Sequence, residues 1–490
     1  MRYFLPFLFL LFCAESPAQA PGQPLADAIA YAHKDCLSLP PQVRVRTRYL
    51  SAASIPIDSR AAFWRVLSGH VNGLSRRAEI IRPRIVDGTT GSLFAVILDD
   101  YGWPPDVFDQ LADADPYFYA DYETPEIWTR THPDGRKEKF TKRVRVRALA
   151  DWLSISPAHA VATQQLPTLL QARAPIVHAP KFLSQTAIQA DRKPGYYDFL
   201  GIRAEADLHR LIGFDTKLAA GRDYREAVAM SGVTQQPRRI SADKTIEGIF
   251  WRTFDNFLAI NERNPLRVLD DKNFKFDASE QFAPGPNGMM VWALFAANGT
   301  RQDSVPDKIA KDGFSTSNDG RIHVGLSCVR CHLAGLSSGI NDIDPWARTL
   351  YVPPVRLKAL LLTDYVELRR QYLRSLAAPI EDSRRIYARA IDQATGLKPA
   401  EYAAAYALAW HEYEDLPVPL QRIEREIGLP ADQIKARLLL DLKSQDRTLG
   451  GQDSVLAMYN HPNFRGIGIR QFEELLPLLM NAMRGVTVPP

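Results

Sequence analysis

In the front half of the chain, short apolar stretches and stretches of alternating apolar and polar residues dominate. In the back half, apolar residues recur at the spacing of a helix. Strands joined by a tight turn are predicted at Glu79–Val86 and Ser92–Leu98. A second hairpin is predicted around 133–135, and a third where Gly288–Ala296 runs into the turn 297–300. Behind residue 350, apolar residues recur every three or four positions. The pattern therefore predicts an α+β fold with strands in front and helices behind.

Helices are also expected between the predicted strands. Asp58 or Ser59 is placed to cap a helix with one apolar face, and Pro104-Pro105 opens another helix that runs to Leu111. Shorter helices are expected at Lys181–Gln189, Ala204–Ile212 and Tyr224–Met230. In the back half, the apolar stripes are Ile434, Leu438, Leu439 and Leu442, and then Phe472, Leu475, Leu476 and Leu479.

The chain has 490 residues, a length that suggests two to four domains. Five parts are predicted from the changes in pattern. They are a signal peptide at 1–20, a mixed α+β region at 21–160, a mainly helical region at 161–255, a strand-rich region at 256–350 and a helical region at 351–490. No internal repeat is found.

The first 20 residues have the layout of a secretory signal. Arg2 precedes an apolar run that ends at Cys13, and the segment closes on Ala18-Gln19-Ala20. Cleavage is expected after Ala20, which implies a periplasmic or secreted protein. Bulky Phe12 argues against Cys13 as a lipid acceptor. The apolar run is too short to span a bilayer, so no transmembrane segment is expected in the mature chain.

The overall charge is nearly balanced. There are 60 basic and 56 acidic residues, which leave a net charge of +4. Nucleic-acid binding depends on a concentrated basic surface, so this class of partner is not expected.

The most informative motif is Cys328-Val329-Arg330-Cys331-His332. C-x-x-C-H is the attachment signature of c-type haem. Two thiols three residues apart on a helical turn reach the two vinyl groups of one porphyrin edge and form thioethers. His332 then supplies the proximal imidazole ligand to the iron. The sequence thus predicts one covalent haem c, held by Cys328, Cys331 and His332, and indicates no separate catalytic residue.

Other interpretations of this motif are weaker. A thioredoxin-like dithiol needs a βαβ setting, and the segment before Cys328 offers only one short strand candidate. A structural zinc site needs a second pair of ligands, which Cys36 alone does not supply. Cys36 is expected to be a small buried thiol, with a disulfide to Cys328 or Cys331 as the alternative. The G-x-S-x-G match at 335–339 is interpreted as a loop beside the haem.

The segment GMMVWALFAANGTRQDSVPDKIAKD, followed by VGLSCVRCH, resembles the attachment region of large secreted bacterial c-type cytochrome domain proteins. Further similar segments are RYLSAASIP, SGHVNGLSRR, LDDYGWPPDVF, DPYFYADY, HAPKFLSQTA and GYYDFLGI. The resemblance covers most of residues 48–340. It implies covalent haem and electron transfer at the motif. Members often carry methionine shortly after the motif, where this chain has Leu333 and Leu336.

The sequence leaves several candidates for the sixth ligand of the iron. A downstream methionine is common in small cytochromes, and histidine is a further option. The candidates are Met289, Met290, His323, His411, Met458, His461, Met480 and Met483, or no protein ligand at all.

Three functions follow from these options. With two protein ligands, the protein is an electron carrier whose partners are other periplasmic redox proteins. With an open iron, it is a haem enzyme, such as a peroxidase or an oxidoreductase subunit, or a haem-based sensor. The electron-transfer hypothesis is preferred because no second catalytic constellation is found.

Overall fold

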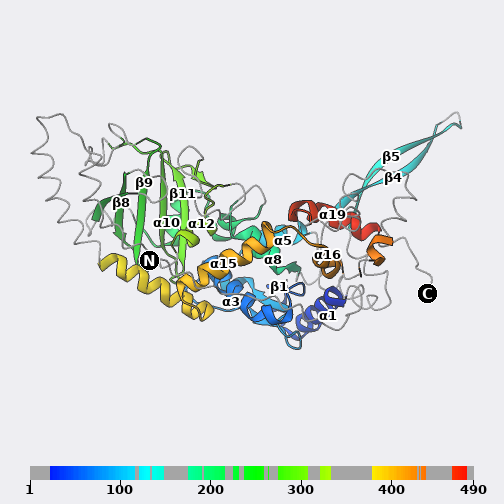
Figure 1. Ribbon diagram of the computed structural model, residues 1–490, viewed down its shortest axis with the longest axis horizontal. Coiled ribbons are helices and arrows are strands. Elements are labelled where there is room, and N and C mark those ends of the chain that lie inside the picture. Colours follow the sequence, from blue (N-terminus) through cyan, green and yellow to red (C-terminus); the bar gives the residue numbers. More distant parts are fainter. Residues whose placement is uncertain are drawn as a thin grey trace, which may run out of the picture.

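The computed structural model describes residues 23–115, 121–132, 135–147, 175–189, 193–215, 225–230, 237–258, 263, 274–306, 320–332, 378–427, 430, 432–436 and 466–482. Sheets and helices are mixed along these residues, so the predicted α+β fold is confirmed (Figure 1). The signal peptide at 1–20, the loop at 335–339, and Met458, His461 and Met483 lie outside the described residues.

A four-stranded sheet of order β2-β3-β1-β6 forms the centre of the front half. Its strands are β1 (Thr47–Ser51), β2 (Arg84–Ile85), β3 (Leu93–Ile97) and β6 (Ile176–His178). β1 pairs antiparallel with β3 and parallel with β6. The predicted hairpin of β2 and β3 is confirmed. The strand predicted at Glu79–Val86 is much shorter, because only Arg84 and Ile85 reach β3.

Helices surround this sheet. They are α1 (Gln23–Ser38), α2 (Pro41–Arg44), α3 (Ile57–Gly73), α4 (Leu98–Tyr101), α5 (Pro105–Asp113) and α8 (Ala179–Thr186). The apolar face predicted for α3 is buried. The capping prediction was wrong, because Pro56 occupies the cap position and Asp58 lies in the first turn.

A six-stranded antiparallel sheet runs in sequence order from β7 to β12. Its strands are β7 (Arg225–Met230), β8 (Pro237–Lys244), β9 (Ile249–Asp255), β10 (Ala278–Pro284), β11 (Met290–Ala296) and β12 (Arg301–Gln302). The predicted hairpin at 288–300 is confirmed as β11 and β12.

The helix predicted at Tyr224–Met230 was wrong, because Arg225–Met230 is strand β7. Its Glu-Ala-Val-Ala-Met sequence favours a helix locally. Pairing with β8, from Arg225↔Ala242 to Met230↔Pro237, overrides that preference. The region predicted as mainly helical therefore contributes three strands to this sheet.

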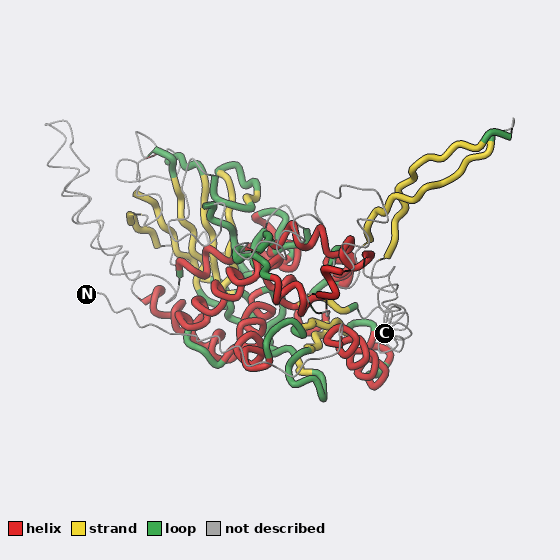
Figure 2. The backbone as a smooth tube through the Cα atoms, turned by 45° about the vertical axis from the view of Figure 1, so that its right-hand side comes forward, coloured by secondary structure: helices red, strands yellow, loops and turns green. Residues whose placement is uncertain are grey.

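A long two-stranded ribbon extends from the body of the molecule (Figure 2). It consists of β4 (Asp121–Thr131) and β5 (Lys137–Arg147), paired from Asp121↔Arg147 to Thr131↔Lys137. The hairpin predicted around 133–135 is thereby confirmed.

The remaining helices lie between the two sheets in sequence or follow the last strand. They are α9 (Tyr196–Leu200), α10 (Glu205–Leu211), α12 (Leu326–Cys331), 378–395, α15 (Pro399–Glu414), α16 (Leu420–Ile427), 432–436 and α19 (Ile469–Ala482). The helical character predicted behind residue 350 holds for the residues described there.

Helix α15 lies against α3, α8 and α12. Gly69 of α3 permits this approach, since a Cβ there would lie 2.3 Å from the ring of Tyr402. None of the helices in the described part of the chain is long and apolar enough to cross a membrane.

Candidate functional site

The C-x-x-C-H motif forms a short helix with its histidine at the carboxyl end. Cys328 and Cys331 belong to α12, and His332 follows as the capping residue. This confirms the predicted helical turn. Cys328 is buried and Cys331 is exposed, and neither forms a disulfide. Two thiols and an imidazole are thus presented by adjacent positions of one helical segment.

Backbone contacts on the side of Gly325 hold α12 in place. Gly325 has φ +87, and a Cβ there would lie 2.4 Å from the carbonyl oxygen of Ala187. The next amide, of Leu326, donates to the same Ala187 oxygen at 2.9 Å. Just ahead of α12, the His323 amide donates to Ser327 Oγ at 3.1 Å. Only a glycine in this backbone region allows the helix to start so close to α8.

Two adjacent tyrosines bind the sheet strand that faces the motif. The amides of Trp292 and Leu294 donate to the hydroxyls of Tyr196 and Tyr197, at 3.0 Å and 2.8 Å. The Tyr197 hydroxyl donates in turn to the Gln302 carbonyl at 3.1 Å. These side chains satisfy amides of β11 that the short β12 leaves unpaired.

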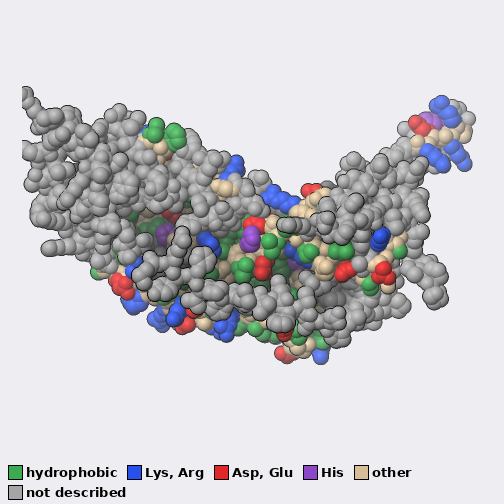
Figure 3. Space-filling view, viewed as in Figure 1, with side chains coloured by type: hydrophobic (Ala, Val, Ile, Leu, Met, Phe, Trp, Pro, Cys, Tyr) green, Lys and Arg blue, Asp and Glu red, His purple; other side chains and the backbone are tan. Residues whose placement is uncertain are grey.

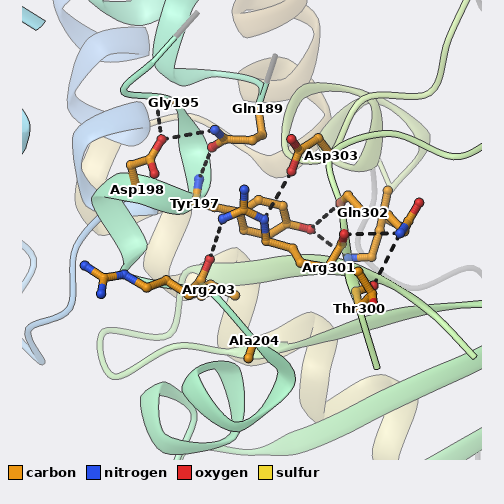
Figure 4. A network of polar contacts seen from close by, with 12 residues as sticks. Gln189, Gly195, Tyr197, Asp198, Arg203, Ala204, Thr300, Arg301, Gln302 and Asp303 are labelled. Carbon is orange, nitrogen blue, oxygen red and sulfur yellow. Dashed lines mark hydrogen bonds and ion pairs between the residues drawn. The ribbon is translucent and has the colours of Figure 1, made fainter. Parts of the chain in front are cut away.

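A polar network holds Tyr197 and the start of α9 in position (Figure 4). Asp198 accepts hydrogen bonds from Gln189 Nε2 at 3.0 Å and from the Gly195 amide at 2.9 Å. Gln189 Oε1 accepts from the Tyr197 amide at 2.8 Å. Arg301 lies over the Tyr197 ring, 4.8 Å from its centroid, and forms an ion pair with Asp303. The network fixes α9 against the sheet, and α9 in turn supports α12.

The imidazole of His332 packs on the sheet between two aromatic rings. Its centroid lies 4.7 Å from that of Trp292, nearly parallel, and 5.4 Å from that of Phe282. His332 Nε2 is 3.8 Å from Glu280 Oε1. Burial alone would raise the pKa of Glu280, but His332 and Arg238 outweigh it, so the pKa is lowered. The histidine of the motif thus faces a carboxylate that is ionised at neutral pH.

Cys328 has the properties of a buried thiol that stays protonated and unreactive. Burial, and then the charge of Glu280, raise its pKa well above the ordinary value. Reactive cysteines in dithiol enzymes have lowered pKa values instead. Among the residues described just ahead of α12, 301–306 and 320–325, the strand pairing consists of β12 and an isolated bridge between Ser304 and His323.

A small cavity of about 30 Å³ lies beside α12. Its lining is formed by aromatic, apolar and uncharged polar side chains with two glycines, and it combines residues of α3, α9, β11, α12 and two later helices. The lining residues are His70, Gly73, Leu74, Tyr196, Met289, Met290, Trp292, Gly325, Val329, Tyr387, Tyr402 and Tyr406.

His70 is a buried titratable group of this cavity, 3% exposed. Burial lowers its pKa to about 3, so the ring is neutral. Thr186 donates to the Phe182 carbonyl, so its oxygen accepts from His70 Nε2, 2.6 Å away. Tyr406 then donates to His70 Nδ1 at 3.0 Å. Both ring nitrogens are therefore occupied.

The candidates for the sixth iron position fall in different places. Met289 and Met290 line the cavity beside Val329, and His323 lies directly before α12. His411 is exposed at the end of α15, 2.8 Å from Asp415, and Met480 belongs to α19. The structure thus brings Met289, Met290 and His323 close to the motif and leaves His411 elsewhere.

Sequence reasoning missed Glu280, Trp292 as a partner of His332, and His70. No local pattern marks them, because each meets the site through a distant segment. Cys36 is a free thiol, 1% exposed, in the core around α1. The prediction of a small buried thiol is confirmed for Cys36.

The residues of the motif fit a covalently attached haem. Neither thiol is in a disulfide, both lie on one helical turn, and the imidazole follows at once. The Trp292 indole N–H, beside His332, is buried without an acceptor among the described residues. Iron binding at His332 Nε2 requires the ring to exchange its contact with Glu280 for the metal. No group of three or more His, Cys, Asp or Glu side chains within the described ranges is arranged to hold a bare metal ion.

No protein-family model matches the chain, and comparisons with curated proteins and with solved structures return no match.

Proposed function

We propose that this protein is an exported c-type cytochrome that carries one covalent haem and transfers electrons. The observation that carries the proposal is the motif helix itself. Two thiols, neither of them in a disulfide, and an imidazole occupy one helical segment, and the Leu326 amide ties the start of that segment to the Ala187 carbonyl. Covalent haem attachment needs this set of groups in this order.

Each residue of the site has a distinct part in the proposal. Cys328 and Cys331 hold the haem by thioethers, and His332 is its proximal ligand. Trp292 and Phe282 pack on the imidazole and restrict its rotation. When bound, the haem supplies reversible one-electron chemistry.

The environment of His332 also bears on the redox behaviour. Glu280 places a negative charge beside the ligand. Negative charge near a haem favours the oxidised, more positive iron, so the carboxylate is expected to lower the reduction potential.

The remaining parts of the proposal rest on the sequence. The signal at 1–20 and the resemblance to secreted cytochrome domain proteins support a periplasmic or secreted location. The partners would be other redox proteins of that compartment, which meet the haem edge in a small transient interface.

The test is expression in a host that attaches haem outside the cytoplasm. The wild-type protein is expected to keep its colour after denaturation, because the haem is covalently bound. The Cys328→Ala, Cys331→Ala double variant is expected to be colourless. Cys36→Ala is the matched control and keeps its haem. A double variant that is still coloured after denaturation contradicts the proposal.

The reduced spectrum of the same preparation, with and without carbon monoxide, distinguishes an electron carrier from a protein with an open iron position. A reduced spectrum that carbon monoxide does not change indicates two protein ligands and supports an electron carrier. A spectrum that shifts with carbon monoxide indicates an open iron and favours a haem enzyme or sensor.

A further inference from the structure

The iron-binding nitrogen of His332 faces a carboxylate oxygen across a gap the size of one metal ion. His332 Nε2 lies 3.8 Å from Glu280 Oε1, and the two side chains are 20% and 17% exposed. Bonds from a first-row metal such as zinc to an imidazole nitrogen or a carboxylate oxygen are each about 2.0–2.2 Å long, and iron is of similar size. An ion held between two such atoms on opposite sides separates them by about 4.0–4.4 Å. The observed spacing is only slightly shorter than this range.

The position of Glu280 is fixed by the larger sheet. Glu280 lies in β10 and is paired with Thr253 of β9 on one side and with Leu294 of β11 on the other. Its Oε2 lies 3.5 Å from Arg238 Nη1, while Oε1 is the oxygen that faces His332. One carboxylate oxygen is thus engaged by the protein, and the other is directed to the place of a sixth ligand.

The charge of Glu280 also suits an iron partner. Arg238 neutralises Glu280 only in part, because its Nε lies closer to Asp255 Oδ1, at 3.1 Å. The pKa of Glu280 is nevertheless lowered, chiefly by His332 and Arg238 acting against burial, so the carboxylate is charged. A ferric haem keeps one positive charge that the porphyrin nitrogens do not cancel. A buried carboxylate needs a charge of this kind beside it, so the two compensate each other.

The other candidates near α12 lack this relationship to the iron-binding nitrogen. Met289 and Met290 line the cavity beside α12, and His332 is not part of that lining. His323 lies ahead of the first residue of α12, whereas His332 follows the last. Among the described residues, the ionic contact of His332 Nε2 is with Glu280.

We propose that Glu280 is the sixth ligand of the haem iron, bound through Oε1 on the side opposite His332 Nε2. This inference rests on the proposed function, because it needs the covalent haem at Cys328 and Cys331. It gives the iron two protein ligands, as the electron-carrier proposal requires. A hard anionic oxygen favours ferric over ferrous iron, whereas methionine raises the potential. The donor that reduces this protein must therefore be a stronger reductant than one that serves a methionine-ligated cytochrome.

The test uses the full mature protein, after its covalent haem has been confirmed by colour that survives denaturation. The oxidised wild type is expected to give the visible and electron paramagnetic resonance spectra of a ferric haem with one imidazole and one oxygen ligand. Cyanide is the probe, because it binds ferric iron and must displace the sixth ligand. Glu280→Gln is expected to change the spectra and to bind cyanide about tenfold or more tightly than the wild type, because an amide is a weaker ligand than a carboxylate.

A matched control separates ligation from charge. Asp255→Asn removes a carboxylate that is paired with the same Arg238, and it is expected to keep the wild-type spectra and cyanide affinity. Glu280→His places a second imidazole at the sixth position and is expected to give the spectra of a haem with two histidine ligands. The oxidised spectra of the wild type decide the question even where a variant fails to fold.

Two results would overturn the inference and leave the proposed function intact. The first is an oxidised wild-type spectrum with the red absorption band of a methionine-bound haem c, or with the signature of two imidazole ligands. The second is a Glu280→Gln variant that matches Asp255→Asn in its spectra and in its affinity for cyanide. A wild-type protein that loses its colour on denaturation would instead overturn the proposed function, and the inference with it.

Discussion

The indole ring of Trp292 is stacked on the imidazole of His332, with 4.7 Å between the ring centroids and 27° between the planes. Trp292 lies in the middle of β11, and its amide is bound by the Tyr196 hydroxyl. The orientation of the motif histidine therefore depends on a strand and a helix that are distant from it in sequence. Substitutions in that strand or that helix are therefore expected to affect the site, although they change neither cysteine.

Tyr196→Phe tests the support of β11. The change removes the acceptor of the buried Trp292 amide and should lower the free energy of unfolding by about 1–3 kcal/mol. Tyr387→Phe removes a hydroxyl that forms no hydrogen bond with a described residue, so it should cost about 0.5 kcal/mol or less. Denaturant unfolding of both variants measures the difference. Equal costs would contradict the role assigned to Tyr196.

Gly325→Ala tests the close approach of α12 to α8. An added Cβ would meet the Ala187 oxygen at 2.4 Å in a left-handed backbone conformation. The free energy of unfolding should fall by more than about 2 kcal/mol, and the yield of covalent haem should fall with it. Gly320 has a similar φ of +66 but open space around it, so Gly320→Ala serves as the control. That control should cost only about 1 kcal/mol, and a similar loss at both positions would contradict the steric argument.

The buried His70 predicts a pH dependence of stability. Its folded pKa is about 3, below the ordinary value, so the folded state stays neutral while the unfolded state takes up a proton below about pH 6.5. The free energy of unfolding should therefore fall as the pH drops from about 6.5 toward 3, by up to about 1.4 kcal/mol per pH unit from this residue.

His70→Asn should lower the number of protons taken up on unfolding by about one, and so reduce the slope of the unfolding free energy against pH. This holds whatever the effect of the substitution on stability at neutral pH. Urea unfolding at several pH values gives both slopes. An unchanged slope for His70→Asn would show that His70 is not the group responsible.

A buried ion pair joins α8 to α19. Lys181 Nζ lies 2.9 Å from Glu473 Oε2, with the side chains 5% and 8% exposed, and Tyr413 donates to the other carboxylate oxygen at 2.8 Å. Glu473→Gln leaves Lys181 as a buried charge without its counter-ion and should cost about 3–5 kcal/mol in unfolding free energy. The double variant Lys181→Met, Glu473→Leu should recover part of this loss. A double variant less stable than Glu473→Gln would refute the account.

The chemistry of the motif was predictable because it is local. Cys328, Cys331 and His332 lie within five residues, so their spacing alone indicated a helical turn that presents them together. The partners of His332 were not predictable in this way. Glu280 and Trp292 reach the motif only through the order of the strands in the larger sheet.

The same distinction explains the errors in the fold. The hairpin at 133–135 and helix α3 have local signals of turn residues and apolar spacing, and both were found. Arg225–Met230 has a local sequence that suits a helix, yet it is a strand because β8 pairs with it. His70 was missed for a related reason, since Tyr406 and Thr186 join it from far along the chain.

The central claim is that Cys328 and Cys331 bind a haem covalently. The most direct test is the intact mass of the mature protein, made in a host that attaches haem outside the cytoplasm. The account predicts the mass of the chain from residue 21 onward plus one haem, with the added mass on the peptide that contains 328–332. A mass equal to the bare polypeptide, or one lower by the two hydrogens of a Cys328–Cys331 disulfide, would contradict it.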